Sequence, residues 1–472
     1  MNPALPDPHY PVAPAHWGRH CASLYGAVVL TSSHEALRLA ADRGSRCAIL
    51  QLSMFTTPQR AWEAEQLVRL DEWMPRWQAL PAYRTWLERE REVPAPAGAR
   101  RDFFRLPFIT KQEIREHSPR NFLRAGQVLE TLLEDELVEL EHTSGTSGER
   151  VPVLLGRGWW AAQEERALRL NAFVARVLDA HPQPRRVVLT TPACSGTACP
   201  SKWLPCAHRT QGTARYANQS RIPFLLSEKE LGDMAAETTE WAPQFLDVDP
   251  VHGTWFALYC ERQGIRFPTL EFVLCSYEFV SVVHQRILER VFGVPVINLY
   301  GATETGHLLM EDERGAMKPS TETAFLEVVD TDAGGIGALA VTTLSNEFTP
   351  LVRYRIGDLV ERREQTPRPT YVVHGRERDS LRDRAGRRVT TWQVDQCFKE
   401  VEGLVHYQLR QDENGACDLR LVPEGDGLAA GELDALTSRL EAQLQLPGPV
   451  VTEAVAVLLP TPSGKFRLTC RT

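Results

Sequence analysis

The segment FVLCSYEFVSVVHQRILERVFGVPVINLYGATETG, residues 272–306, decides the fold class. Its apolar runs 272–276 and 294–301 are typical of buried strands. The residues between them, 279–293, have the pattern of a helix that ends at a glycine. A strand, a crossover helix and a second strand form a βαβ unit, in which the two strands are parallel. The sequence therefore predicts an α/β protein with mostly parallel sheets.

Other apolar runs extend this unit in both directions. RRVVLTTP (185–192) is predicted as a further buried strand, and GALAVTTL (337–344) and YVVHG (371–375) suit a mixed sheet or a barrel-like subdomain. A charge-dense stretch then leads into a tail that alternates helical and strand patterns. The helices of the tail are expected at 391–402 and 430–444, and its strands at 404–411, 417–422 and 449–459.

Length and composition point to a globular protein of two domains. The 472 residues exceed the roughly 250–300 at which a single core stops growing. We expect a large multi-subdomain N-terminal domain, 1–377, and a small α+β C-terminal domain, 378–472. A hydrophobic content of 43% excludes a disordered or collagen-like chain. The net charge of −8 is mild, so no nucleic-acid partner is expected.

No part of the sequence indicates export or membrane insertion. The longest apolar runs fall short of the roughly 18–20 residues that cross a bilayer. The first 20 residues are rich in proline and lack a basic segment followed by an apolar one, so we expect no signal peptide. The ten cysteines have no scaffold-like spacing, which favours reduced thiols. The expected location is the cytoplasm, with no membrane partner.

The first chemical motif is HTSGTSGER (142–150), a run of small and hydroxyl residues followed by Arg150. Backbone N–H groups of such a loop can close around phosphate oxygens, and its hydroxyls add donors. Taken alone, the run is more often a solvated turn. The residues concerned are Thr143, Ser144, Gly145, Thr146, Ser147 and Gly148.

The second motif, NLYGATETG (298–306), leaves a buried strand through Gly301. Ligands of α/β sheets bind at such strand ends. Tyr300 offers an aromatic face, Thr303 a hydroxyl, and Glu304 a carboxylate of the kind that Mg²⁺ prefers. The competing interpretation is an ordinary strand-to-loop turn with an exposed acid.

Three weaker motifs follow. Asp358 in VRYRIGDLV can accept hydrogen bonds from both hydroxyls of a ribose, Arg376 follows a glycine, and Lys465 lies in the turn of PTPSGKFRLT. The competing interpretations, without a function, are an aspartate in a β-turn, a basic linker and a solvated lysine. A further cluster has the spacing of no standard zinc site, and ordinary thiols are favoured over a metal. Its members are Cys194, Cys199, Cys206 and His208.

The order of these motifs is more specific than any of them. A phosphate loop, then Y-G-x-T-E, R-x-G-D, G-R and P-x-x-x-G-K resembles the adenylate-forming superfamily of acyl-CoA ligases, luciferases and peptide-synthetase adenylation domains. LPFITKQEIREHSP (106–119) and the terminal SGKFRLT are similar to the phenylacetate-CoA ligase-like and CapK-like branch. The resemblance runs from about residue 60 to the end.

The resemblance implies an activity and its cofactors. A carboxylic acid attacks the α-phosphate of ATP, which gives an acyl-adenylate and pyrophosphate, and the acyl group passes to a thiol. Coenzyme A is favoured as acceptor by family frequency, with a carrier-protein thiol or an amine left open. The C-terminal domain would be mobile and would rotate between the two half-reactions. The alternative from another class is a noncatalytic nucleotide-binding homologue, and a homodimer is left open.

The resemblance also implies a role for each site residue. Thr143 to Gly148 would hold the β- and γ-phosphates and Thr303 the α-phosphate, with Mg²⁺ on Glu304. Asn298 would read adenine and Tyr300 stack on it, next to Gly301 and Glu278. Asp358 and Arg376 would fix the ribose. Lys465 would reach between the carboxylate and the α-phosphate, where negative charge concentrates in the transition state.

One departure from the family concerns the acid. The usual Gly-Gly-Glu is replaced by Ser276-Tyr277-Glu278, so an aromatic ring stands where relatives have a glycine. We expect Tyr277 and Phe279 to lie on one side of the 272–279 segment and to line a pocket for a planar, aromatic acid. The competing interpretation is that these rings fill the core.

Overall fold

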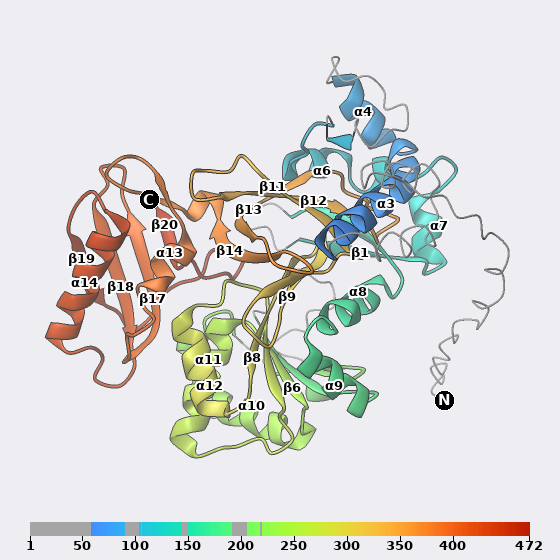
Figure 1. Ribbon diagram of the computed structural model, residues 1–472. Helices are drawn as coiled ribbons and strands as arrows, with labels where there is room; N and C mark the ends of the chain where they lie inside the picture. Colours follow the sequence, from blue (N-terminus) through green and yellow to red (C-terminus); the bar gives the residue numbers. More distant parts are fainter. Residues whose placement is uncertain (1–57, 90–102, 105, 144–149, 191–204, 218–219) are drawn as a thin grey trace. The chain divides into compact units, whose positions relative to one another are not determined.

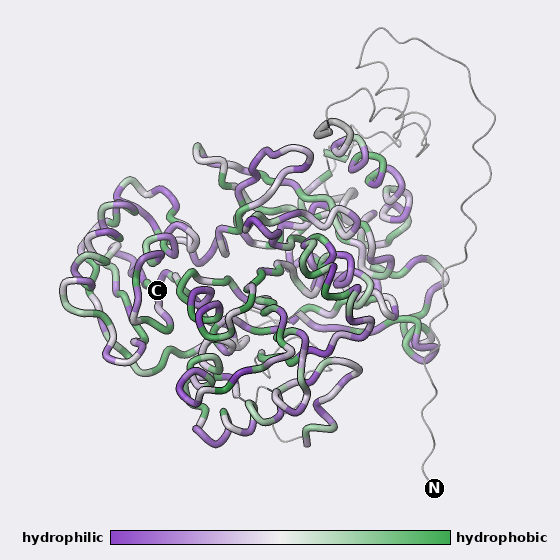
Figure 2. The backbone as a smooth tube through the Cα atoms, turned by 60° about the horizontal axis from the view of Figure 1, so that its bottom comes forward, coloured by the Kyte–Doolittle hydropathy of each residue, from purple (hydrophilic) through white to green (hydrophobic). Residues whose placement is uncertain are grey.

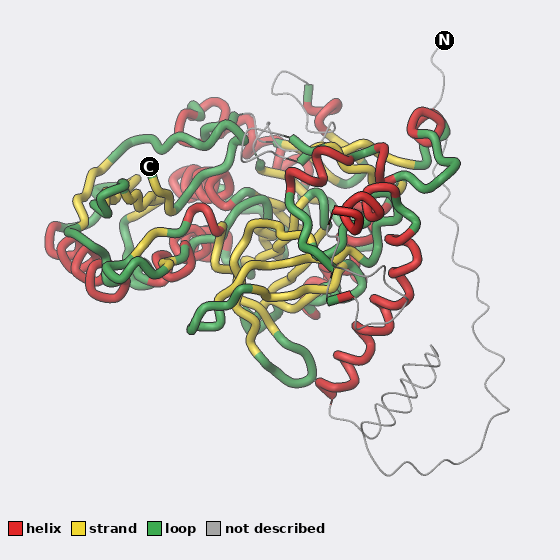
Figure 3. Tube along the Cα trace, turned by 90° about the horizontal axis from the view of Figure 1, so that it is seen from above, coloured by secondary structure: helices red, strands yellow, loops and turns green. Residues whose placement is uncertain are grey.

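The computed structural model describes residues 58–89, 103–104, 106–143, 150–190, 205–217 and 220–472 (Figure 1). Among these residues, twelve strands form one large sheet in the order β11-β12-β13-β14-β10-β9-β8-β7-β6-β3-β5-β4. A four-stranded sheet near the C-terminus and two two-stranded sheets complete the described strands. Figure 3 shows the strands of the large sheet together in the centre, with the helices around them.

The predicted βαβ unit forms the parallel part of the large sheet. β7 pairs in parallel with β6 and with β8, and β6 pairs in parallel with β3, which pairs in parallel with β5. Their bounds are β3 Arg186–Leu189, β5 Ala214–Tyr216, β6 Phe245–Val248, β7 Phe272–Cys275 and β8 Val296–Ala302. The crossover helix α12 (Val282–Phe292) ends at Gly293, which adopts the left-handed φ of 67° that favours glycine.

The rest of the large sheet is antiparallel. β9 turns back along β8, and β10, β14, β13, β12 and β11 follow with antiparallel pairing. The expectation of mostly parallel sheets therefore holds for the middle of the chain, while the sheet as a whole is mixed. The bounds are β4 Thr210–Gln211, β9 Gly306–Glu311, β10 Met317–Pro319, β11 Ala324–Val329, β12 Ile336–Thr343, β13 Tyr354–Arg363 and β14 Thr370–Arg376.

Helices cover both faces of the parallel strands, as Figure 1 shows. The first face packs on α10 (Glu228–Trp241), α11 (Pro250–Gln263) and α12. The second face packs on α8 (Trp159–Leu168) and α9 (Ala172–Ala180). Alternation along the strands assigns the side chains to these faces. The first face is apolar and consists of Val187, Leu189, Leu246, Val248, Val273 and Cys275.

The N-terminal helices pack against the antiparallel part of the sheet. They share a core with the strand residue Tyr354, which is fully buried. A two-stranded antiparallel sheet, β1 (Val138–His142) with β2 (Pro152–Gly156), lies between them and the parallel strands in sequence. The helices are α3 Pro58–Gln78, α4 Pro81–Arg89, α6 Lys111–His117 and α7 Leu129–Glu134, with short 3₁₀ turns at Arg120–Phe122, Cys206–Arg209 and Pro223–Leu225.

The tail has the elements that its sequence predicts. A four-stranded sheet in the order β19-β18-β17-β20 carries two helices. The predicted boundary between 377 and 378 falls at a 3₁₀ turn, Glu377–Asp379, and as a domain limit it stays a prediction. The elements are β15 Leu381–Arg382, β16 Arg388–Val389, α13 Thr391–Gln396, β17 Leu404–Gln411, β18 Cys417–Pro423, α14 Ala430–Leu444, β19 Val450–Ala454 and β20 Thr469–Arg471.

Polar contacts join the tail to helix α12. The Asp395 carboxylate accepts hydrogen bonds from Ser281 Oγ at 2.5 Å and from the Val282 N–H at 3.1 Å. Close by, the buried imidazoles of His284 and His406 are hydrogen-bonded at 3.0 Å and stack on each other. Burial lowers the pKa of His284 to about 4, so this pair is neutral at pH 7.

Within the described part of the chain, no helix is long and apolar enough to cross a membrane. Figure 2 shows the same property along the tube, where hydrophobic stretches are short and alternate with hydrophilic ones.

Candidate active site

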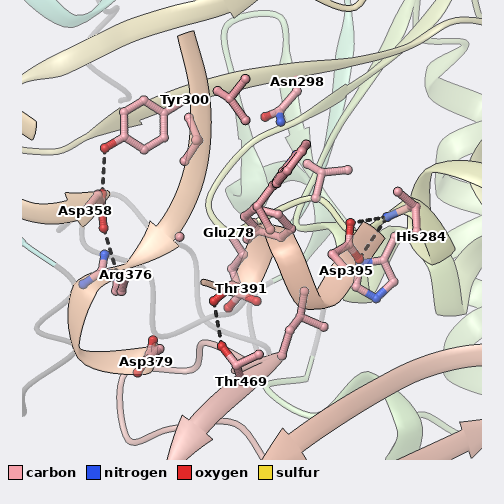
Figure 4. A pocket seen from close by; sticks show the side chains of 18 of the residues that line it. Glu278, His284, Asn298, Tyr300, Asp358, Arg376, Asp379, Thr391, Asp395 and Thr469 are labelled. Atoms are coloured by element: carbon pink, nitrogen blue, oxygen red, sulfur yellow. Dashed lines mark hydrogen bonds and ion pairs between the residues drawn. The ribbon is translucent and has the colours of Figure 1, made fainter. Parts of the chain in front are cut away.

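Two cavities meet at the carboxyl ends of the parallel strands. The first has a volume of about 460 Å³ and is lined by β8, β13, β14 and the tail (Figure 4). The second has a volume of about 450 Å³ and extends toward α8, β3 and β6. A small group of residues lines both cavities: Tyr277, Leu299, Gly301, Asp358, Arg376 and Lys465.

A chain of three polar side chains forms one wall of the first cavity. Tyr300 Oη donates a hydrogen bond to Asp358 Oδ2 at 2.7 Å, and Arg376 Nε lies 3.6 Å from Asp358 Oδ1, as Figure 4 shows. The register of the sheet explains this meeting, because Asp358 on β13 is the direct partner of Arg376 on β14. Burial and the neighbouring Asp358 raise the pKa of Tyr300 well above its usual range, so its phenol stays protonated.

Asn298 and Glu311 also line the first cavity. The Asn298 N–H donates to Glu311 Oε2 at 2.8 Å, and the Asn298 amide is labelled in Figure 4. Burial raises the pKa of Glu311 to about 7, against the opposing effect of this hydrogen bond. Sequence reasoning missed Glu311, because its place in an apolar strand gives no signal of a ligand role.

Lys465 brings the tail to the junction of the two cavities. Its Nζ donates to the Tyr277 carbonyl at 2.8 Å, and the next N–H, that of Phe466, donates to Glu278 Oε1 at 2.8 Å. Burial, with the nearby charge of Arg376, lowers the pKa of Lys465. Burial and Asp249 raise the pKa of Glu278. The lysine of the terminal motif is therefore held by the segment that precedes the Y-G-x-T-E motif.

Glu304 lines the second cavity together with Thr143 and Thr303. It is 5% exposed, and its Oε1 accepts a hydrogen bond from Tyr354 Oη at 2.8 Å. Lys111 Nζ lies 4.0 Å from the same oxygen. Burial lowers the pKa of Lys111, although Glu304 opposes this effect. Sequence reasoning did not single out Lys111, although it lies in the LPFITKQ motif that carried part of the resemblance.

Tyr277 and Phe279 both line the first cavity, and Tyr277 also lines the second. Tyr277 adopts a left-handed φ of 74°. Because β7 ends at Cys275, before these residues, strand alternation does not determine where their side chains point. Phe272 stacks on Phe245 at 4.8 Å inside the core. Glycine adopts a positive φ most easily, and the family that the sequence resembles has a glycine where this chain has Tyr277.

Several predicted site residues lie outside the described part of the chain. Thr143 is buried, and it closes the predicted phosphate loop by two hydrogen bonds with the Val151 backbone. Ser144, Gly145, Thr146, Ser147 and Gly148 lie outside the described residues. The same is true of Cys194 and Cys199, so the proposed thiol cluster is not tested. Among the described residues, Cys206 is a free thiol, and no group of three or more potential ligands is placed to hold a metal.

Two curated proteins are similar to the sequence, while no family model matches. A phenylacetate-coenzyme A ligase of Thermus thermophilus is 26% identical over 381 residues, which cover 76% of this chain and 79% of that protein. Protein CapK of Staphylococcus aureus is 27% identical over 189 residues, which cover 38% of this chain and 42% of CapK.

Solved structures share the fold. The crystal structure of 2-hydroxyisobutyryl-CoA ligase in the postadenylation state superposes with a TM-score of 0.65 at 18% identity and covers 88% of this chain and 89% of that chain. The anthranilate CoA ligase AuaEII gives a TM-score of 0.51 at 13% identity over 70% of this chain and 65% of that chain.

The large mixed sheet therefore shares its fold with these acyl-CoA ligase structures. The sequence is similar to a phenylacetate-coenzyme A ligase and to protein CapK, the branch that its motif order resembles.

Proposed function

We propose that this protein is an AMP-forming acid–thiol ligase. It activates a carboxylic acid with ATP as an acyl-adenylate, releases pyrophosphate, and transfers the acyl group to a thiol. The observation that carries this proposal is the position of Lys465 at the meeting point of the two cavities. The adenosine in the first cavity, and the phosphates with the acid in the second, would meet at this ammonium group, which stabilises the negative charge that develops in the reaction.

The first cavity suits the adenosine. Tyr300 offers a ring for stacking, Asn298 an amide for the adenine edge, and the Asp358 carboxylate an acceptor for ribose hydroxyls. Arg376 neutralises Asp358 and adds donors near the ribose. Glu278 and Gly301 line the wall of this cavity, and a Cβ on Gly301 would collide with the Gly306 carbonyl oxygen of β9, so a glycine is required there.

The second cavity suits the phosphates and the metal. Thr303 would contact the α-phosphate, and the loop that begins at Thr143 would hold the β- and γ-phosphates. Glu304 fits Mg²⁺, because its contacts with Tyr354 and Lys111 use Oε1 and leave Oε2 for a hard cation. The bound ion would neutralise the polyphosphate. Chelation should abolish pyrophosphate release, and Mg²⁺ should restore it.

The acid is proposed to be planar and aromatic. Among the described residues, the aromatic rings on the second cavity belong to Trp160, Tyr216 and Tyr277, so Phe279 is replaced in this role. Aromatic walls favour flat ligands by roughly 0.5–1.5 kcal/mol beyond area burial. The Tyr277→Gly variant should lose its preference for aryl over fatty acids. A wild-type preference for long alkyl acids would contradict this assignment.

Coenzyme A is the proposed acceptor. The neighbour 2-hydroxyisobutyryl-CoA ligase is solved with CoA, at a TM-score of 0.54 for its open conformation, which supports the choice. Transfer to an amine or to a carrier protein is the alternative. Incubation of the acyl-adenylate with CoA or with hydroxylamine separates these acceptors. The cytoplasmic location, the lack of nucleic-acid and membrane partners, and a homodimer remain expectations from sequence.

The C-terminal domain, 378–472, is proposed to move between the two half-reactions. The contact of Lys465 with the Tyr277 carbonyl suits the adenylation step. In support, 2-hydroxyisobutyryl-CoA ligase in its thioesterification state superposes less well than in its postadenylation state, with TM-scores of 0.51 and 0.65 at similar coverage.

ATP–pyrophosphate exchange is the experiment that tests the function. An acid-dependent exchange with a panel of aryl acids is expected. If ATP binds but no acid supports exchange, the noncatalytic alternative is correct.

A further inference from the structure

Four polar side chains meet on the wall of the second cavity, and the proposed catalytic steps use none of them. Glu164 comes from α8, Arg186 from β3, Asp247 from β6 and His307 from β9. Arg186 Nη1 lies 3.0 Å from Glu164 Oε1 and 3.5 Å from Asp247 Oδ2. His307 Nε2 lies 3.7 Å from the same oxygen of Glu164. We call these four residues the polar cluster.

Burial of the polar cluster carries a large desolvation cost. Its side chains are only 7–21% exposed. A buried ion pair is often no more stabilising than well-packed apolar residues of similar volume. The opposite face of the same strands is apolar, with Val187 and Leu246 next in sequence to the charged residues. The charges are therefore confined to the face that reaches the cavity, which favours a ligand over a purely structural role.

Tyr277 connects the polar cluster to the reaction centre. Its carbonyl accepts the hydrogen bond from Lys465, and its Oη donates to Asp247 Oδ2 at 3.3 Å. Lys465 and Asp247, at the two ends of the second cavity, are thus separated by about the length of one tyrosine, from its carbonyl to its hydroxyl group. An acid with a single ring, its carboxylate at Lys465, would reach the polar cluster with a substituent at the opposite end of the ring.

The polar cluster keeps hydrogen-bonding capacity for such a substituent. The contacts of the Arg186 guanidinium with Glu164 and Asp247 use Nη1, so its Nε and Nη2 are not used by them. Among the described residues, the buried His307 Nε2 has no hydrogen-bond partner, because 3.7 Å to Glu164 is too long. Buried groups of this kind favour a ligand that completes their hydrogen bonds.

Charge narrows the choice of substituent. Among the described residues that line the second cavity, seven are aspartate or glutamate and four are lysine or arginine. A second carboxylate on the substrate would add to the excess of negative charge. A hydroxyl or an amino group donates to the carboxylates and, when neutral, also accepts from Arg186.

We propose that the polar cluster selects an aromatic acid that carries a hydroxyl or amino group at the end remote from its carboxylate. This inference rests on the proposed acid-activating function and names its substrate class. Glu164, Arg186, Asp247 and His307 are then specificity-determining residues that bind the substituent.

The test compares four acids by the pyrophosphate they release: phenylacetate, 4-hydroxyphenylacetate, 4-aminophenylacetate and 4-carboxyphenylacetate. One of the two substituted donors should exceed phenylacetate at least about 100-fold in kcat/KM, because a site built for a polar group rejects the analogue that lacks it. The two donor arms distinguish hydroxyl from amine. Turnover that favours phenylacetate or the dicarboxylate overturns this inference alone. Lack of turnover with every acid, while ATP still binds, overturns the proposed function and this inference with it.

Two isosteric variants separate recognition from folding. Glu164→Gln and Asp247→Asn should each lower the ratio of kcat/KM between the preferred donor acid and phenylacetate by about tenfold or more. Glu165→Gln is the matched control, because Glu165 is the exposed neighbour of Glu164 on α8, and this variant should keep the wild-type ratio. A purely structural role would lower the activity on both acids equally and leave the ratio unchanged, which would contradict the proposal.

Discussion

The two cavities each hold a buried glutamate, and the two carboxyl groups titrate in opposite directions. In the first cavity, burial raises the pKa of Glu311 to about 7. In the second, burial alone would also raise the pKa of Glu164, but Arg186 and His307 outweigh it and lower this pKa to about 2. The neighbouring guanidinium and imidazole groups therefore distinguish Glu164 from Glu311, which has no such cation among the groups that shift its pKa.

This difference indicates what each cavity is built to hold. The first cavity keeps the isolated Glu311 easily protonated, so its wall near Asn298 is close to neutral, as an uncharged base requires. In the second cavity, Arg186 and His307 keep Glu164 ionised, so this wall suits a ligand with polar groups. The predictions below test this contrast, from the largest expected effect to the smallest.

Lys465→Ala tests the point where the cavities meet. Since the loss of one preorganised charge on a transition state costs about 100-fold or more, acid-dependent exchange should fall by at least this factor. ATP affinity measured by calorimetry should change little. Lys229→Ala is the control, because that lysine is exposed on the surface. Near-normal exchange in Lys465→Ala would refute the junction role.

Asp358→Ala should weaken the binding of ATP more than that of the acid, because its carboxylate is bonded to Tyr300 on the wall of the first cavity. Each lost hydrogen bond to a charged group costs roughly 1.5–3 kcal/mol, so the ATP dissociation constant should rise about tenfold or more. The Michaelis constant for the acid should stay within a few-fold of wild type. Asp426→Ala, at an exposed position away from both cavities, serves as the control. An unchanged ATP dissociation constant would count against the ribose role.

Arg186→Met should lower the free energy of unfolding, because it leaves Glu164 and Asp247 in the second cavity without their cation. Removal of one partner of a fully buried pair costs 3–5 kcal/mol, and the 21% exposure of Arg186 reduces this to roughly 2 kcal/mol of unfolding free energy. Denaturant unfolding at pH 7 measures this loss. Arg185→Met, at the preceding position, should lose much less. Equal losses in the two variants would show that the polar cluster is not electrostatically coupled.

Glu311→Gln should remove a pH dependence that belongs to the first cavity. Because the folded pKa of about 7 exceeds the unfolded value of 4.5, this carboxyl contributes stability below pH 4.5 and loses it as pH rises through 7. Relative to wild type, the variant should gain up to about 2 kcal/mol between pH 5 and pH 8. Unfolding of both proteins at the two pH values measures the gain, with the exposed Glu413→Gln as control. A pH-independent difference would contradict the raised pKa.

Much of the fold could be predicted because its signals are local. Apolar runs located β3, β7 and β8, and the 3.6-residue period with its terminal glycine located α12. The tail strand β17 has the predicted bounds, Leu404–Gln411. Motif order alone brought Asp358 and Arg376 into one prediction, and the register of β13 and β14 places them side by side.

The polar cluster could not be predicted because its residues come from distant segments. Arg186 and Asp247 lie in short, mostly apolar strands, where a single charged residue is typical of the end of a strand. Only the pairing of β3 with β6 brings the two residues together. Strand alternation also could not show that Phe279 does not line the second cavity, because β7 ends at Cys275 and Tyr277 has a left-handed backbone.

The Asp395 carboxylate of the tail accepts hydrogen bonds from Ser281 Oγ and the Val282 N–H, so the tail supplies part of the N-terminal cap of α12. If the tail turns away, the first turn of this helix loses an acceptor whose removal costs about 1 kcal/mol. Backbone amides there, at Val282 and Val283, would then exchange with deuterium faster than those near Phe292. The exchange rates of these amides in helix α12 therefore report the position of the tail, and no attached probe is needed to measure them.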